Sequence, residues 1–131
     1  MRMWMLPVHF MCQQHRLGEH AEIHKHRHVF EKGQSIQGRV SPIVQIEPLN
    51  MRLRHNLLML TFKTHKFDYT MPDLSAYPDS QINVEVDIEY NLNDLYNRCS
   101  KCRKIMDSYG YDFETLITHA TRIYNNIYKR R

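Results

Sequence analysis

Cysteine is scarce in this sequence, with three residues among 131, and long apolar runs are missing altogether. Cys12, Cys99 and Cys102 are too few for the disulfide framework of a small secreted protein. No apolar stretch approaches the length that a bilayer span requires. The first residues also lack the long apolar segment and small-residue cleavage site of a signal peptide. We therefore expect an intracellular protein without a membrane partner, whose chain starts at Met1.

Several catalytic motifs are missing as well. The sequence contains no GxxxxGK[ST] string of a nucleotide-binding loop, no HExxH string and no Ser-His-Asp order. The hydrophobic fraction of 42% and the aromatic fraction of 11% are ordinary for a folded soluble chain. Its length fits one domain with a modest core. The net charge of +4 favours a polyanionic partner, although charge alone does not identify nucleic acid.

Apolar residues recur mainly at helical spacing, which predicts an all-α fold. We expect one compact domain, residues 1–131, of three to four helices joined by long ordered loops. The expected helices cover approximately residues 10–28, 48–67, 92–106 and 112–128. The last of these has the clearest amphipathic pattern, and Asp112 is its expected N-cap.

The second expected helix is the most apolar and is the predicted centre of the core. Leu53, Leu57 and Leu60 form one stripe along it. Arg54 is expected to point away from that stripe.

The first 25 residues combine a free terminus with a polar helix face. His15, Glu19, Glu22 and Lys25 lie three or four positions apart, so they share one face of a helix, and Gln14 lies beside it. Such a face is either solvated or lines a site. Glu22 is the candidate catalytic carboxylate, to be oriented and tuned by its polar neighbours.

The amino terminus is the candidate nucleophile. Because Arg2 is large, we expect Met1 to be retained. An α-amino group has a pKa near 8, so a useful fraction is neutral at physiological pH. A primary amine can attack a sugar C1′ or a carbonyl and form a Schiff base. Because every protein has an amino terminus, the amine is a candidate nucleophile only if a carboxylate lies beside it.

The segment from Gln14-His15 through Glu19 to Glu22 resembles the first helix of the phage pyrimidine-dimer DNA glycosylase/AP lyase known as endonuclease V. That family has a Gln-His pair, an acidic residue four positions after the His and a catalytic Glu three positions later. The match runs ungapped to Met1 and Arg2. A weaker likeness, from Leu53-Arg54-His55 through Lys66-Phe67, extends the resemblance over about residues 1–70. The C-terminal helix has no counterpart.

The resemblance implies an all-α DNA repair enzyme without a metal or organic cofactor. The Met1 amine would attack C1′ of a damaged nucleotide, displace the base and form an imine, with Glu22 assisting the proton transfers. β-Elimination would then break the strand. The residues implied to bind DNA are Arg2, Gln14, His15 and Lys25. The enzyme would act as a monomer on double-stranded DNA in the cytoplasm of a bacterial or phage-infected cell.

Two residues that differ from the family pattern affect which DNA lesion we expect as the substrate. Ala21 stands where the family has an arginine, and Lys25 replaces another arginine, which keeps the charge but loses the bidentate fork. The substrate can thus be a UV cyclobutane dimer, which we favour, an abasic site or another modified pyrimidine.

Three other interpretations compete with this one. The chain can be a basic helical module that binds nucleic acid without catalysis. Alternatively, the row His20, His24 and His28 can hold the metal of a nuclease, although we expect this spacing to be incidental. In the third interpretation, the motif Cys99-Ser-Lys-Cys102 would supply two ligands of a structural zinc site, and Cys12 and a histidine would have to complete it. We expect reduced thiols packed on a helix instead, and no metal.

Overall fold

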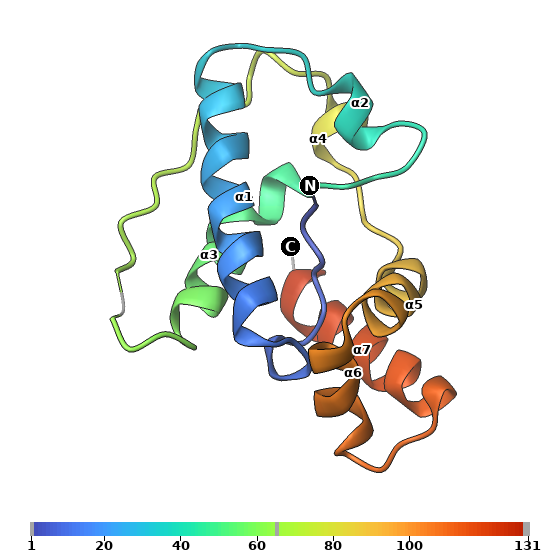
Figure 1. Ribbon diagram of the computed structural model, residues 1–131. Helices are drawn as coiled ribbons and strands as arrows, with labels where there is room; N and C mark the ends of the chain where they lie inside the picture. The colour runs from blue at the N-terminus through green and yellow to red at the C-terminus, as the bar shows by residue number, and fades with distance from the viewer. Residues whose placement is uncertain (1, 65, 130–131) are drawn as a thin grey trace. The chain divides into compact units, whose positions relative to one another are not determined.

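The computed structural model describes residues 2–64 and 66–129, and within these ranges it contains helices and no strands (Figure 1). The α-helices are α1 (Gln13–Glu31), α2 (Gln37–Val40), α3 (Met51–Met59), α4 (Asp79–Ile82), α5 (Ile88–Arg98), α6 (Ser100–Asp107) and α7 (Phe113–Tyr128), with 3-10 helices η1 (Val8–Phe10) and η2 (Pro48–Asn50). The predicted all-α class is confirmed. None of the described helices combines the length and the hydrophobicity needed to cross a membrane.

The chain folds as two compact units. The first unit consists of Met1–Met3 and Leu17–Val86, and the second of Trp4–Arg16 and Asp87–Arg131. Helix α1 contributes its first residues to the second unit and its remaining residues to the first.

Helix α1 begins and ends three residues later than the sequence predicts, at Gln13 and Glu31. Gly33 explains its end, because its φ of 66° is the left-handed conformation that glycine adopts without a Cβ clash. The Gly33 amide donates to the Phe30 carbonyl and the Gln34 amide to the Val29 carbonyl, at 3.1 and 3.0 Å. These two bonds form the Schellman motif that closes a helix.

Helix α3 buries a different face from the predicted one. Leu53 and Leu60 are 41% and 55% exposed, whereas Arg54 is 1% exposed. The buried face consists of Met51, Arg54, His55, Leu58 and Met59. The predicted leucine stripe is therefore wrong, because a polar contact of Arg54 sets the rotation of the helix.

The second expected helix is also shorter than predicted, since α3 ends at Met59. Beyond it, the Thr61 and Phe62 amides donate to the Leu58 and Met59 carbonyls, three residues back, at 3.1 Å each. The Thr61 hydroxyl adds a bond of 2.7 Å to the same Leu58 carbonyl. These tight turns end the α-helical hydrogen-bond pattern.

The contact that orients α3 is a buried ion pair within the first unit. Arg54 Nε lies 2.8 Å from Glu19 Oε2, and Arg54 Nη2 lies 2.9 Å from Glu19 Oε1. Both side chains are buried, with 1% and 0% of their surfaces exposed. The two parallel hydrogen bonds give the bidentate geometry that best offsets the desolvation of both charges.

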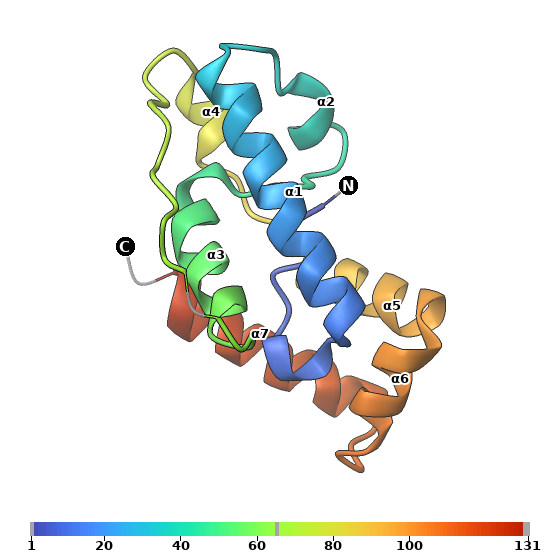
Figure 2. The same cartoon turned by 60° about the vertical axis from the view of Figure 1, so that its left-hand side comes forward.

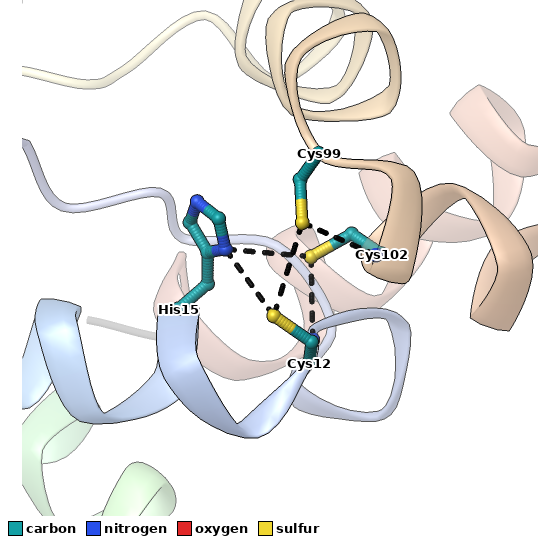
Figure 3. A group of neighbouring side chains, drawn as sticks. All are labelled: Cys12, His15, Cys99 and Cys102. Carbon is teal, nitrogen blue, oxygen red and sulfur yellow. Dashed lines mark hydrogen bonds between the residues drawn. The ribbon is translucent and has the colours of Figure 1, made fainter.

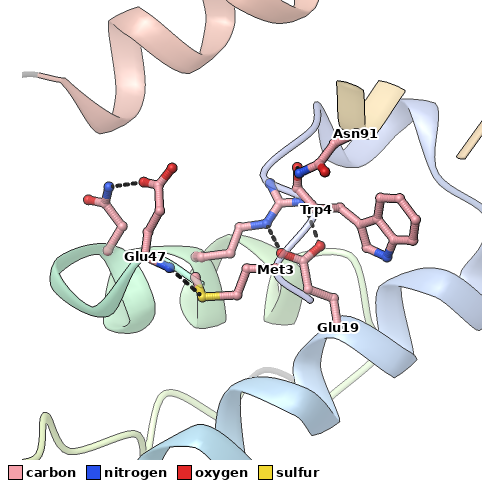
Figure 4. A network of polar contacts seen from close by, with 7 residues as sticks. Met3, Trp4, Glu19, Glu47 and Asn91 are labelled. Atoms are coloured by element: carbon pink, nitrogen blue, oxygen red, sulfur yellow. Dashed lines mark hydrogen bonds and ion pairs between the residues drawn. The ribbon is translucent and has the colours of Figure 1, made fainter. Parts of the chain in front are cut away.

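A second buried carboxylate, Glu47, joins distant segments of the first unit. Its Oε1 accepts from Asn50 Nδ2 at 2.7 Å, and its Oε2 accepts from the Val86 amide at 2.8 Å. The Glu47 amide lies 3.4 Å from Met3 Sδ (Figure 4), and the Met3 amide donates to the Gln45 carbonyl at 2.7 Å. Glu47 thus fixes the segment before α3 and the end of the unit together.

In the second unit, α5 packs against α6 and α7, as both views show (Figures 1 and 2). The helix predicted over residues 92–106 is two helices, α5 and α6, because Cys99 adopts an extended backbone with φ −116° and ψ 110°. Asp87 caps α5 by accepting from the Tyr90 amide at 3.0 Å. Asp112 caps α7 by accepting from the Thr115 amide at 2.8 Å, which confirms the predicted N-cap.

The Glu19–Arg54 pair gives the first testable prediction. Arg54→Met leaves a buried carboxylate without its guanidinium, so we expect a loss of about 3–5 kcal/mol in the free energy of unfolding. The double variant Glu19→Leu/Arg54→Met removes both charges, and most of the loss should be regained. Arg52→Met, at an exposed position on the same helix, is the matched control. Urea unfolding measures all four proteins. A cost below about 1 kcal/mol for Arg54→Met would contradict the assignment.

Candidate functional site

Glu22 lies on the part of α1 that belongs to the first unit, and its side chain is 19% exposed. Its Oε1 is 3.4 Å from the Nζ of Lys25, one helical turn further along. Its Oε2 is buried and has no hydrogen-bond partner among the described residues. A buried oxygen that accepts no hydrogen bond costs free energy, so this half of the carboxylate is suited to a contact beyond those that the described residues make.

His26 follows Glu22 one turn later and is 1% exposed. Neither of its ring nitrogens has a hydrogen-bond partner within the described ranges. Burial, and next the Arg39 guanidinium, lowers the pKa of His26 to about 4, whereas Glu22 opposes that change. The imidazole is therefore neutral at physiological pH.

Arg39 lies in the short helix α2, and its buried Nε also lacks a partner among the described residues. We call Glu22, Lys25, His26 and Arg39 the Glu22 cluster. Its members lie in one unit, and electrostatic interactions or an ion pair connect each of them to another. Three of them hold buried polar atoms that have no hydrogen-bond partner in the described part of the chain. Such atoms are available to hydrogen-bond water or a ligand.

The chemistry available to the Glu22 cluster follows from its charges. The free carboxylate oxygen can accept a proton or stabilise a positive charge on a substrate. Lys25 beside this carboxylate and Arg39 near His26 supply two cations, which favours an anionic substrate such as a phosphodiester. His26 adds a neutral imidazole that can donate and accept hydrogen bonds.

Of the residues predicted from the sequence, Glu22 and Lys25 are brought together. Met1 lies outside the described residues, and Arg2 is half-buried in the first unit. Gln14 is exposed and His15 half-buried, and both belong to the second unit.

Sequence reasoning missed His26 and Arg39. His26 carries a signal that could have found it, because it lies four positions after Glu22 and so shares its helix face. Arg39 lies between the first two expected helices, and nothing in the spacing pairs it with α1.

The histidine row is assembled differently from the predicted one. His55 Nε2 lies 3.2 Å from His20 Nε2 and 3.1 Å from His24 Nε2, so three imidazoles converge in the first unit. His28, the expected third member, instead has its Nδ1 3.7 Å from Glu31. Burial, followed by the neighbouring His55 and His24, lowers the pKa of His20 to about 4.

The second unit holds its own cluster of nucleophilic and metal-ligating side chains. Cys12, His15, Cys99 and Cys102 place one ligand atom each within 4.8 Å of all the others (Figure 3). The three thiols are free of disulfides. His15, predicted to bind DNA, therefore contacts cysteines.

No protein-family model, curated protein or solved structure matches this chain. The resemblance to endonuclease V therefore stays a hypothesis from the sequence, and what the protein does is inferred from its own residues.

The buried His26 makes the stability of the protein depend on pH. Its pKa is about 4 in the folded protein and about 6.5 in an unfolded chain. Between these values only the unfolded state takes up the proton, so stability falls as pH decreases through this window. Between pH 7 and pH 5, the free energy of unfolding of the parent protein should fall by about 1–2 kcal/mol more than that of His26→Met. Urea unfolding at both pH values measures this difference. His28→Met, at an exposed position on the same helix, should retain the parental pH dependence. Equal losses for the parent and His26→Met would refute the assignment.

Proposed function

We propose that the protein is a DNA repair glycosylase with AP lyase activity. Its substrate is double-stranded DNA that contains a damaged pyrimidine, for which a cyclobutane dimer is the leading choice, or an abasic site. The amine of Met1 is the nucleophile, and Glu22 is the catalytic carboxylate.

The observation that carries this proposal is the state of Glu22. One of its oxygens is buried and accepts no hydrogen bond from the described residues, while the other has only a long contact of 3.4 Å with Lys25. A carboxylate kept for structure has its oxygens satisfied, as Glu19 and Glu47 have. Glu22 is therefore the carboxylate of α1 that is suited to work on a substrate.

The surroundings of Glu22 favour nucleic acid as that substrate. Lys25 is 65% exposed at its side chain and can meet a phosphate without losing its place on α1. Arg39 provides a second cation, and its buried Nε donates no hydrogen bond to any described residue. Phosphate contacts of this kind position a protein on DNA without reading its sequence. The net charge of +4 agrees with this partner.

The proposed reaction needs no cofactor. The neutral amine attacks C1′, the glycosidic bond breaks and the base leaves with its bonding electrons and takes up a proton. Opening of the sugar ring gives an imine between the amine and C1′. Glu22 stabilises the cationic sugar and assists the proton transfers. Loss of a C2′ proton then expels the 3′ phosphate, and hydrolysis of the imine frees the amine.

Borohydride trapping tests the amine directly. The protein with a free Met1 amine should become covalently linked to duplexes that contain an abasic site or a cyclobutane dimer, because borohydride reduces the imine to a stable amine. Acetylated or N-terminally extended protein should trap less than about 1% as much, since the attacking group is absent. Equal trapping by the blocked protein would refute the Met1 amine as the nucleophile.

The same assay separates the competing functions. Duplex binding that weakens with salt, with no trapped product on any lesion, would indicate a non-catalytic binding module. Strand cleavage that a chelator abolishes would indicate a metal-dependent nuclease using the histidine row.

Glu22→Gln tests the carboxylate. The amide keeps the size of the side chain but can neither take up a proton nor stabilise a cation, so we expect turnover to fall about 100-fold or more. Binding to damaged duplex should change little, because the neighbouring cations remain. Glu31→Gln, an exposed position later on α1, is the matched control and should keep full activity. Single-turnover kinetics and gel-shift titrations measure the two quantities. Full turnover by Glu22→Gln would show that Glu22 is not the catalytic carboxylate.

A further inference from the structure

We propose that Cys12, His15, Cys99 and Cys102 form a structural zinc site in the second unit. All four residues belong to that unit, although 87 positions of the chain separate Cys12 from Cys99 and His15 from Cys102. One imidazole nitrogen and three sulfurs converge there (Figure 3), which is a ligand set used by structural zinc sites.

The distances between the ligand atoms fit a tetrahedron. With Zn–S near 2.3 Å and Zn–N near 2.0–2.1 Å, tetrahedral angles place two sulfur ligands about 3.8 Å apart and a sulfur and a nitrogen about 3.6 Å apart. Cys12 Sγ lies 3.9 Å from Cys99 Sγ. His15 Nδ1 lies 3.3 Å from Cys12 Sγ and 3.7 Å from Cys102 Sγ. One cation can therefore bind all four atoms with small adjustments.

The local fold presents each pair of ligands at a helix start. Cys12 immediately precedes α1, and His15 lies in its first turn. Cys99 is the residue at which α5 ends and α6 begins, and Cys102 lies in the first turn of α6. Both pairs have two residues between the ligands, the short spacing that zinc sites use. The break between α5 and α6 thus has a role, because it turns the Cys99 sulfur toward the others.

Backbone amides already point at two of the sulfurs. The Cys12 amide donates to Cys102 Sγ at 3.2 Å, and the Cys102 amide donates to Cys99 Sγ at 3.4 Å. Donors of this kind stabilise the negative charge of metal-bound thiolates. The ring of His15 meets that of Trp4 edge-on at 6.0 Å, and the Trp4 carbonyl accepts from Asn91 Nδ2 at 3.0 Å. These contacts support the imidazole from outside the ligand set.

The ligand set also indicates what the ion does. Four protein ligands close a tetrahedral zinc site and leave no position for water or substrate, so the metal stabilises the fold and takes no part in catalysis. This proposal replaces the expectation of packed, reduced thiols and no metal. It is independent of the proposed repair activity, which needs no metal.

Metal analysis of the intact protein, purified without a tag or chelator, tests the site. We expect about one zinc per chain by mass spectrometry of the digested sample. After exchange, Co²⁺ should show the intense visible bands of tetrahedral coordination together with sulfur-to-metal charge transfer. A reduced protein that contains no zinc and gives no such spectrum with added Co²⁺ would overturn the proposal. A disulfide between any two of the cysteines in freshly purified protein would also overturn it.

Variants distinguish the four ligands from the rest of the chain. His15→Phe and Cys102→Ser should each reduce bound zinc at least tenfold and lower the melting temperature. His15→Cys should keep one zinc as a four-thiolate site, with stronger charge transfer from Co²⁺, and this gain is measurable even if His15→Phe does not fold. His119→Phe, in the same unit but outside the cluster, is the matched control and should keep its zinc.

The histidine cluster of the first unit requires a separate control. His20→Gln disrupts that cluster and should leave both the zinc content and the thiolate spectrum unchanged. Zinc that is lost in His20→Gln and retained in His15→Phe would assign the metal to the histidines and refute the proposed site.

Discussion

The first unit depends on the burial of the Glu19 carboxylate against Arg54. Two charges can be removed from water together only when their hydrogen bonds are short and well aligned, and here both nitrogen–oxygen distances are below 3 Å. This requirement fixes the rotation of α3 against α1. It also explains the exposure of Leu53 and Leu60, because a helix that points Arg54 inward must turn those leucines outward. A single polar contact therefore outweighs the apolar stripe, since an unpaired buried charge costs more free energy than two exposed leucines.

Glu19 and Glu22 lie one turn apart on α1 and occupy opposite states. Glu19 has both oxygens hydrogen-bonded to a guanidinium, whereas one buried oxygen of Glu22 accepts no hydrogen bond from the residues that the structure describes. The same helix thus carries a carboxylate that holds the fold and a carboxylate that is available for chemistry. The ion pair of Glu19 limits the movement of Glu22, because residues of one helix move together as a rigid element. A site that must meet a substrate with little rearrangement gains from such support.

Periodicity predicted the elements whose buried faces are apolar and missed those whose buried faces are polar. The last helix and its Asp112 cap agree with the prediction because α7 buries Leu116, Ala120 and Tyr124 at helical spacing. Helix α3 does not agree, because hydrophobicity cannot signal a buried arginine. In the Glu22 cluster, spacing along one helix is enough to pair Glu22 with Lys25. Arg39 joins through its electrostatic effect on His26, which the local sequence does not encode. The CxxC motif alone favoured reduced thiols over a metal site, and nothing in the sequence selected His15 from nine histidines as a fourth ligand.

Packing alone does not account for the convergence in the second unit. A thiol is a weak hydrogen-bond donor and acceptor, so three reduced cysteines gain little free energy by gathering around one imidazole. Buried thiols that serve only as small apolar groups can lie anywhere in a core. Here, instead, Cys99 breaks a helix that the apolar pattern would continue, and two backbone amides are directed at sulfurs. Small folding units commonly need an added cross-link because their apolar cores are limited. A zinc ion would join the start of α1 to the α5–α6 junction, and the free energy of its binding would offset both the break in the helix and the entropy of closing a long loop.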